Sequence, residues 1–308
     1  FVVNYEEGGE NCLLHGDQQS EAFLSEIIGA QPWINQRHWN MESIYDYGAR
    51  AGFWRLRDLF TEASIPVTVY GVATALARSP DQMLAMQKAG WEIASHGYKW
   101  IDYKDFSRAD EAKHIKLAIE LHKQVTGSSP KGWYTGRCSH NTVDLVCETG
   151  GFTYISDSYA DDLPYWHIHN KKPNLIIPYT LDANDMRFAA PQGFNSGDQF
   201  FSYLRDSFNS LYQEGENGHP KMMSVGLHCR LIGRPGRIES LRRFLEYIDK
   251  HDHVWCPRRI DIANFWHQNY PCDTEELLNR PSYMNRTKFL KKFSDIFRGA
   301  PWLAEATF

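Results

Sequence analysis

Short runs of apolar and β-branched residues recur along the whole chain, and amphipathic stretches separate them. This alternation is typical of an α/β protein with a mostly parallel sheet, because two parallel strands need a crossover connection, usually a helix. The predicted strands cover residues 1–5, 66–72, 91–95, 132–134, 154–157, 176–179, 223–228 and 254–256.

Two of the separating stretches have helical spacing. Residues 47–63 and 107–126 place apolar side chains three and four positions apart, and Gly127 follows the second stretch as a helix stop. No G-x-G-x-x-G pattern follows the first strand, so an open dinucleotide-binding sheet is not indicated. We therefore predict an α/β fold, a distorted (β/α) barrel of seven or eight strands over residues 1–271. In such barrels the chemistry takes place at the carboxyl ends of the strands.

Charge and composition exclude several classes of protein. The net charge is −5 and no run of Lys or Arg occurs, which argues against a nucleic-acid partner. No apolar stretch approaches the roughly 20 residues that cross a bilayer, so we expect no membrane association. The six cysteines are scattered without a C-x-x-C pair, which favours a reduced, cytoplasmic setting.

Two adjacent carboxylates end the first predicted strand. Because side chains alternate along a strand, Glu6 and Glu7 should point to opposite faces, one of them toward the barrel mouth. A buried carboxylate beside a like charge has a raised pKa, which suits a general acid or base near neutral pH. The alternative is that both side chains are simply solvated at the strand end.

Two histidines also end predicted strands. His96 follows residues 91–95, and His228 closes residues 223–228. Histidine titrates near physiological pH and is the commonest metal ligand, although a single histidine is more often a hydrogen-bonded structural residue. Two histidines at strand ends, together with the carboxylate pair, indicate a reactive site.

Further polar side chains cluster in segments that follow other predicted strands. A guanidinium near a pocket can hold a carbonyl or a developing oxyanion through its fixed fork of donors. Each of these residues could equally form a loop ion pair. The candidates are Tyr134, Arg137, Asn141, Asp157, Asp161, Asp162, Asp182, Asn184, Asp185, Arg187, Arg230 and Arg234.

Four segments resemble, in order, the motifs of the polysaccharide deacetylase superfamily, which read T-F-D-D-G, H-S/T-x-x-H, R-x-P-Y-G and L-x-L-H. The matching segments are residues 4–8 (NYEEG), 96–100 (HGYKW), 134–138 (YTGRC) and 225–228 (VGLH). By this resemblance Glu6 takes the position of the base, and Glu7 and His96 take positions of metal ligands. Trp100 replaces the second histidine ligand, so fewer than the three ligands of an open catalytic zinc site remain. Tyr134 replaces the motif arginine.

These departures are similar to one branch of the superfamily, the cofactor-independent allantoinases of urate breakdown. The shared segments are residues 4–10 (NYEEGGE), 95–98 (SHGY), 132–137 (GWYTGR), 161–166 (DDLPYW), 184–188 (NDMRF) and 226–235 (GLHCRLIGRP). The resemblance implies that the chain opens the cyclic amide of allantoin to give allantoate, with no cofactor and as a homotetramer.

The resemblance also suggests roles for the candidate residues. Glu6 or Glu7 would take the proton from water, and His96 and His228 would act as partner acid or as orienting groups. Arg137 or Arg230 would stabilise the oxyanion with backbone N–H groups. The residues expected to bind the substrate are Trp100, Tyr134, Arg137, Asp157, Asp185, Arg187 and Arg230, with the ureido group at Asp157, Asp185 and Arg187.

Two other functions remain open from the sequence. One is a zinc-dependent deacetylase of chitin or chitooligosaccharides, with the metal held by Glu7, His96 and His228. The other is a non-catalytic, carbohydrate-binding barrel, which the altered motifs would favour.

The composition shifts after residue 271. Residues 272–308 are expected to form a linker and an incomplete helical segment. Residues 284–289 (MNRTKF) and 300–305 (APWLAE) resemble the start of the decarboxylase that acts on 2-oxo-4-hydroxy-4-carboxy-5-ureidoimidazoline. The resemblance implies a fusion of which only the beginning is present.

Overall fold

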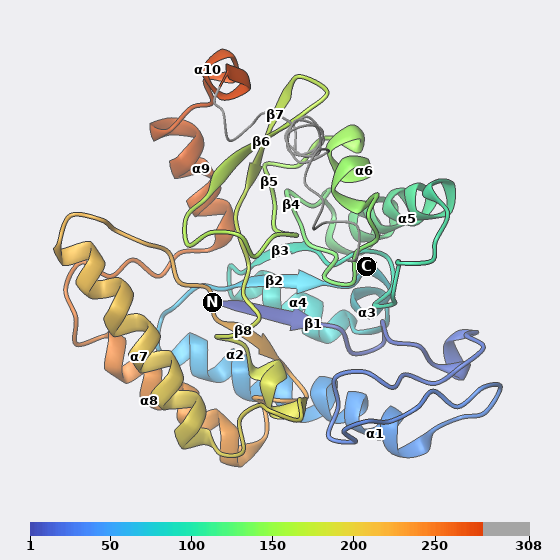
Figure 1. Cartoon of the computed structure of the whole chain (residues 1–308). Coiled ribbons are helices and arrows are strands. Elements are labelled where there is room, and N and C mark those ends of the chain that lie inside the picture. Colours follow the sequence, from blue (N-terminus) through green and yellow to red (C-terminus); the bar gives the residue numbers. More distant parts are fainter. Residues whose placement is uncertain (280–308) are drawn as a thin grey trace, which may run out of the picture.

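The computed structural model of the chain describes residues 1–279, and its centre is a single eight-stranded sheet (Figure 1). The strands lie in the order β6-β7-β5-β4-β3-β2-β1-β8. All neighbours are parallel except β6 and β7, which form an antiparallel pair at one end of the sheet. The strands are β1 Val2–Tyr5, β2 Thr68–Gly71, β3 Glu92–Ser95, β4 Gly132–Trp133, β5 Tyr154–Ile155, β6 Tyr165–His169, β7 Lys172–Ile176 and β8 Gly226–His228.

The sheet curls toward closure beyond β8. Asn184 forms a parallel bridge with Gly226, whose backbone N–H donates to the carbonyl oxygen of Ala183. The segment that follows β7 therefore returns to the far side of β8. This arrangement confirms the predicted α/β class and the distorted barrel.

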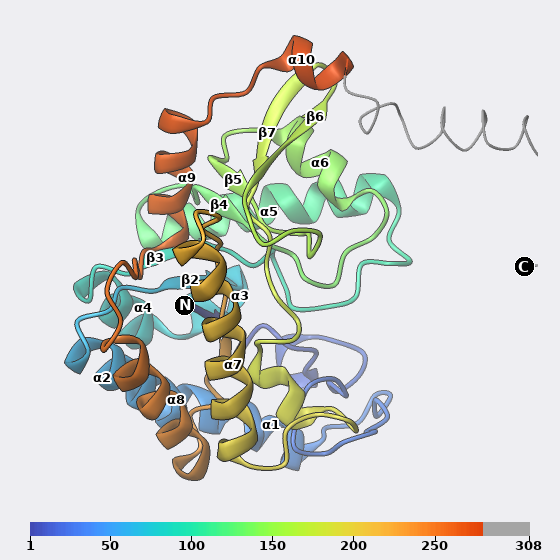
Figure 2. The same cartoon turned by 60° about the vertical axis from the view of Figure 1, so that its left-hand side comes forward.

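Helices surround the sheet (Figures 1 and 2). Helices α7 and α8 pack together beside β8 and β1, and α3, α5 and α6 lie around the middle strands. The helices are α1 Trp39–Tyr47, α2 Phe53–Glu62, α3 Ala73–Arg78, α4 Pro80–Lys88, α5 Arg108–Thr126, α6 Thr142–Thr149, α7 Gly197–Glu216, α8 Pro235–Ile248, α9 Arg259–Asn269 and α10 Thr274–Asn279. Single helical turns cover Leu13–His15, Gly48–Gly52 and Asp185–Ala189. No helix within residues 1–279 is long and apolar enough to cross a membrane.

Helix α5 confirms the prediction for residues 107–126, including both ends. The side chain of Ser107 accepts a hydrogen bond from the backbone N–H of Asp110, which caps the helix start. Gly127 ends the helix with φ 85°, in the left-handed region that glycine adopts without strain.

The helix predicted over residues 47–63 begins earlier, at Trp39, and contains a π-turn at Gly48–Gly52. Both glycines of this turn are required by close packing. A Cβ at Gly48 would lie 2.3 Å from Oε1 of Glu7, and one at Gly52 would lie 1.9 Å from the carbonyl oxygen of Cys229. The turn therefore lets the helix backbone approach the loops that follow β1 and β8.

Three strand predictions differ from the structure. Residues 254–256 form no strand, because this apolar run lies at the surface with Trp255 59% exposed. Strand β7 ends at Ile176, so the predicted strand 176–179 overlaps it by one residue. The sequence prediction missed β6, whose residues are all half-buried and lack a clear apolar run.

Of the predicted C-terminal segment, residues 272–308, the structure describes only the beginning. Residues 272–279 contain the short helix α10, and the decarboxylase-like stretches 284–289 and 300–305 lie outside the described residues.

Candidate active site

Glu6 and Glu7 follow β1 and diverge, as the alternation of a strand predicts. Oε1 of Glu6 lies 3.3 Å from Nε2 of His96 and 3.4 Å from Nε2 of His228. The other oxygen, Oε2, accepts a hydrogen bond of 2.6 Å from Nη2 of Arg230. The ends of β1, β8 and β3, which lies one strand beyond β2, therefore converge on this one carboxylate.

Glu7 has a different task. Its carboxylate accepts hydrogen bonds from the backbone N–H groups of Glu6 and Arg230, at 3.1 and 3.2 Å. It also packs against the π-turn at Gly48. The structure gives Glu7 no hydrogen bond or ion pair with His96 or His228. Glu7 therefore fixes the loops that carry Glu6 and Arg230, and Glu6 is the glutamate that meets the histidines.

His228 is held from behind by a buried carboxylate. Nδ1 of His228 lies 2.6 Å from Oδ1 of Asp185, and Oδ2 of Asp185 accepts from the backbone N–H groups of His228 and Ile232, at 2.7 and 3.0 Å. Burial alone would lower the pKa of His228, but the charges of Glu6 and Asp185 outweigh it and raise this pKa to about 9. At neutral pH the ring is therefore an imidazolium that faces Glu6.

Asp185 was expected to bind a ureido group. Both of its oxygens are instead occupied by His228 and the backbone beside it. Its position makes it a residue that orients His228 and stabilises the charge on the imidazole.

Arg230 is fully buried and acts through Glu6. Its guanidinium lies over the rings of Tyr45 and Trp100, at 4.4 and 5.2 Å, and its Nε donates to the carbonyl oxygen of Leu24. Burial of Glu6 would raise its pKa, yet Arg230 and His228 hold this pKa well below the usual range. The predicted raised pKa therefore occurs at Glu7, where burial is the largest cause, and not at Glu6.

His96 directly follows β3, and His228 ends β8, on the other side of β1. The ring of His96 lies 5.0 Å from the ring of Tyr134, which stacks on Tyr70 at 4.7 Å and shares a hydrogen bond of 2.9 Å with the hydroxyl of Tyr159. Nδ1 of His96 is buried and has no hydrogen-bond partner within residues 1–279. Tyr134 thus forms an aromatic wall of the site.

Asp157 fixes the loop after β4. Its carboxylate accepts from the backbone N–H groups of Thr135 and Gly136 at 2.8 Å, and Sγ of Cys138 lies 3.2 Å away. These contacts hold the loop that carries Tyr134 and Arg137. Asp157 is therefore a support of the site, and the structure gives it no contact with Glu6.

Arg137 and Trp100, two predicted substrate-binding residues, form a cation–π cluster with Phe23 beside the site. The guanidinium of Arg137 lies 5.0 Å from the ring of Trp100 and 5.2 Å from that of Phe23. Phe23 stacks on Trp100 at 5.7 Å, and Arg137 lies 3.6 Å from Glu21. Phe23 was missed by the sequence analysis, because nothing in its local sequence marks it.

Arg187 lies apart from this cluster. Its guanidinium lies over Phe194 and Tyr203 and donates to the carbonyl oxygen of Gln192. The structure gives it no contact with Glu6, His96 or His228. Although Arg187 is only two residues from Asp185 in the sequence, its side chain therefore does not reach the site.

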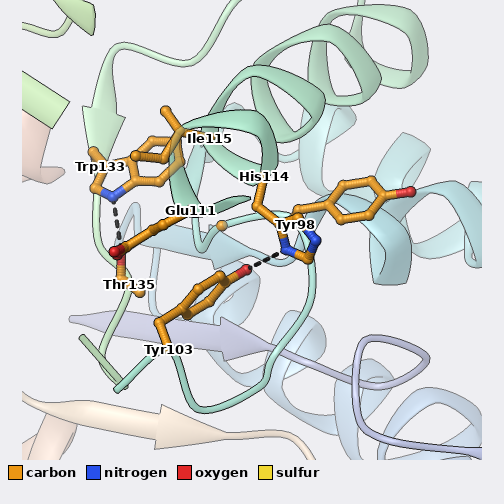
Figure 3. A pocket seen from close by; sticks show the side chains of 8 residues that line it. Tyr98, Tyr103, Glu111, His114, Ile115, Trp133 and Thr135 are labelled. Carbon is orange, nitrogen blue, oxygen red and sulfur yellow. Dashed lines mark hydrogen bonds between the residues drawn. The ribbon is translucent and has the colours of Figure 1, made fainter. Parts of the chain in front are cut away.

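A small pocket lies next to the site, between α5 and the loops that follow β3 and β4 (Figure 3). Tyr103 and His114 share a hydrogen bond across it, and Trp133 donates to Thr135 at its edge. Glu111, which lines the pocket, accepts from Ser139. These polar side chains of the pocket thus already have hydrogen-bond partners, which is typical of packing around a loop.

Comparison with known proteins identifies the family. The family described as Polysaccharide deacetylase matches residues 40–153. A Schizosaccharomyces pombe protein named "Putative polysaccharide deacetylase" is 42% identical over 289 residues, which cover 88% of this chain and 90% of that protein. The chain belongs to the polysaccharide deacetylase family.

Solved structures of this family share the fold closely. A "probable Polysaccharide deacetylase" from Pseudomonas aeruginosa PAO1 is 56% identical with a TM-score of 0.87, covering 89% of this chain and 91% of that one. The structure of Puue allantoinase is also 56% identical with a TM-score of 0.87, covering 88% and 90%. Family membership and this neighbour together support a hydrolase that acts on carbon–nitrogen bonds.

The groups around Glu6 do not fit a divalent metal ion. The carboxylate that meets both histidines already faces two cations, the guanidinium of Arg230 and the imidazolium of His228. Glu7, the ligand suggested by the motif, is turned toward backbone N–H groups. A third cation would be repelled by both neighbours.

Proposed function

We propose that this chain hydrolyses the hydantoin ring of allantoin to allantoate without a metal ion. The observation that carries the proposal is the position of the Glu6 carboxylate between the rings of His96 and His228. Arg230 and the protonated ring of His228 supply the positive charge beside it. The 56% identity to Puue allantoinase over 88% of this chain supports the choice of substrate.

The first step is attack of water on the ring carbonyl. Glu6 is ionised at neutral pH and accepts a proton from the water as the new C–O bond forms. A carboxylate with a lowered pKa is a weak base. As the new C–O bond forms, however, the attacking water becomes strongly acidic, so Glu6 can take its proton.

The second step is departure of the ring nitrogen. His228, protonated and oriented by Asp185, donates its Nε2 proton to that nitrogen as the C–N bond breaks. Transfer of the proton from Glu6 to His228, across 3.4 Å, then restores the starting state. One water is consumed, and the products are a ureido N–H and a carboxylic acid, which releases its proton to solvent and becomes the carboxylate.

His96 and the stacked Arg137 complete the proposal. The unpaired Nδ1 of His96 is available to a substrate oxygen or N–H group. Arg137, beside the stacked rings of Phe23 and Trp100, is assigned the binding of a carbonyl of the substrate. Arg230 positions Glu6 and is not assigned a contact with the oxyanion.

Substitution tests the role of Glu6. Glu6→Gln keeps the shape of the side chain and removes the charge, so allantoate formation should fall by at least about 100-fold. Glu120→Gln on the exposed face of α5 is the matched control and should leave turnover unchanged. Full activity of Glu6→Gln would refute the assignment.

We also propose the homotetramer and the cytoplasmic location that the family resemblance implies. Light scattering on the purified chain measures the mass of the assembly. A monomer at all concentrations would contradict the tetramer.

A further inference from the structure

A second cluster of reactive side chains lies in the loop after β1. Glu10, Cys12 and His15 bring a carboxylate oxygen, a thiol sulfur and a ring nitrogen within 4.8 Å of one another. Glu10 and Cys12 are 5% and 4% exposed, and His15 is half-buried. We propose that these three residues bind a divalent transition metal ion, of which Zn²⁺ is the best match.

The state of His15 points to a missing ligand. Its Nδ1 is buried and has no hydrogen-bond partner in the part of the chain that the structure describes. The ring also interacts with the backbone of Glu10. A histidine bound to metal through one nitrogen commonly uses the other for a backbone carbonyl or carboxylate, and a buried nitrogen with no partner costs free energy.

The ligand types suit zinc. Thiolate, imidazole and carboxylate are its three protein ligands, and an ion held by Cys12 and Glu10 as anions would be neutralised in the buried site. In tetrahedral zinc, ligand atoms lie about 3.4 Å apart, as bond lengths of about 2.1 Å require. The three atoms lie within 4.8 Å of one another and would close toward that spacing around the ion, with water as the fourth ligand.

The loop that carries the ligands is held in shape without the ion. Cys12 precedes the turn Leu13–His15, its carbonyl oxygen accepts from the backbone N–H of His15, and Gly16 closes the turn with φ 87°. The backbone N–H of Cys12 donates to Asp17 at 3.0 Å, and Glu10 accepts from the backbone N–H of Gly8 at 2.6 Å. The second hydrogen bond leaves the other oxygen of Glu10 for the ion.

This cluster is separate from the groups around Glu6. No hydrogen bond or ion pair is found within residues 1–279 between its three residues and Glu6, His96 or His228. The ion would fasten the loop on the carboxyl side of Glu6 and Glu7, so its effect on the protein is structural. Zinc binding is therefore independent of the proposed ring opening.

A second group of potential ligands provides an internal comparison. Asp144, His167 and His169 also gather within 4.8 Å, between α6 and β6. There, however, both ring nitrogens of His169 have partners, Asp144 on one side and Glu148 and Asn170 on the other. That group contains no thiol, which makes the two sites distinguishable by spectroscopy.

The test uses the full chain, stripped with chelator and titrated with Co²⁺ as a spectroscopic probe for zinc. We expect one equivalent to produce the charge-transfer absorption of a thiolate bound to Co²⁺, and Zn²⁺ to displace it. Cys12→Ser should abolish the band and weaken Zn²⁺ binding by more than about 100-fold. Cys147→Ser, at the half-buried thiol of α6, is the matched control and should keep both the thiolate band with Co²⁺ and the affinity for Zn²⁺.

Unfolding of the metal-free Cys12→Ser chain shows whether the substitution itself harms the fold. His15→Ala, which removes a ligand but no thiol, should weaken binding in the same way. A chain that gives no thiolate band with Co²⁺, or a Cys12→Ser variant that binds Zn²⁺ as the parent does, would overturn the proposal. Binding lost only on substitution of His167 and His169 would place the ion at the other group.

Discussion

Substitution of Asp185 by asparagine tests the proposed acid directly. The Asp185 carboxylate lies 2.6 Å from Nδ1 of His228, is fully buried, and is one of the two charges that raise the pKa of His228 to about 9. A hydrogen bond to a charged group contributes roughly 1.5–3 kcal/mol, and one pKa unit corresponds to about 1.36 kcal/mol. Loss of the charge should therefore lower the pKa of His228 by about 1–2 units.

The sign of the effect on activity follows from the role of His228. If protonated His228 is the acid, kcat/KM falls as pH rises through its pKa, so the parent should lose activity near pH 9. In Asp185→Asn this alkaline limb should move down by about 1–2 units, with a lower maximal rate.

The assay is allantoate formation across pH, with the ring protons of His228 followed by NMR. Asp182→Asn is the matched control, because Asp182 bonds to Thr180 and Tyr203 and not to His228. An alkaline limb that stays in place in Asp185→Asn would refute the assignment of His228 as the acid.

Three further predictions concern stability and binding. Since the pKa of His228 is raised in the folded state, the stabilisation by its charged ring is complete below the unfolded pKa of about 6.5 and is lost as pH rises to about 9. Chemical unfolding should show that the free energy of unfolding falls by up to about 3 kcal/mol over this range, and His228→Asn should abolish the fall. Gly48→Ala, whose Cβ would meet Glu7, should lower the free energy of unfolding by about 1–3 kcal/mol. Gly215→Ala in α7, whose Cβ would make only a contact at 3.8 Å, should raise it by up to about 1 kcal/mol. Equal effects of the two substitutions in denaturant titrations would contradict the packing argument. Arg137→Ala should raise KM for allantoin more than it lowers kcat, and a steady-state analysis with unchanged KM would remove Arg137 from the substrate site.

The fold and part of the site could be predicted because they depend on local patterns. The alternation of apolar runs located β1, β2 and β3, and the two-residue period of a strand separated Glu6 from Glu7. Strand ends also indicated His96 and His228, which the structure brings to the same carboxylate.

The pairings across the chain could not be predicted from local patterns. Arg230 and Glu6 are 224 residues apart, so no local signal reveals that the guanidinium neutralises this carboxylate and lowers its pKa. The same holds for Asp185 behind His228, which looked like a substrate ligand among other polar residues. Phe23 was missed because its role depends on Trp100 and Arg137, brought beside it by the fold.

Allantoate formation after exhaustive dialysis against chelator tests directly whether ring opening proceeds without a metal ion. We expect full turnover of allantoin in chelator and no gain on addition of zinc, because the charge at Glu6 is supplied by Arg230 and His228. Activity that appears only with zinc, or acetate released from chitooligosaccharides with no turnover of allantoin, would contradict it.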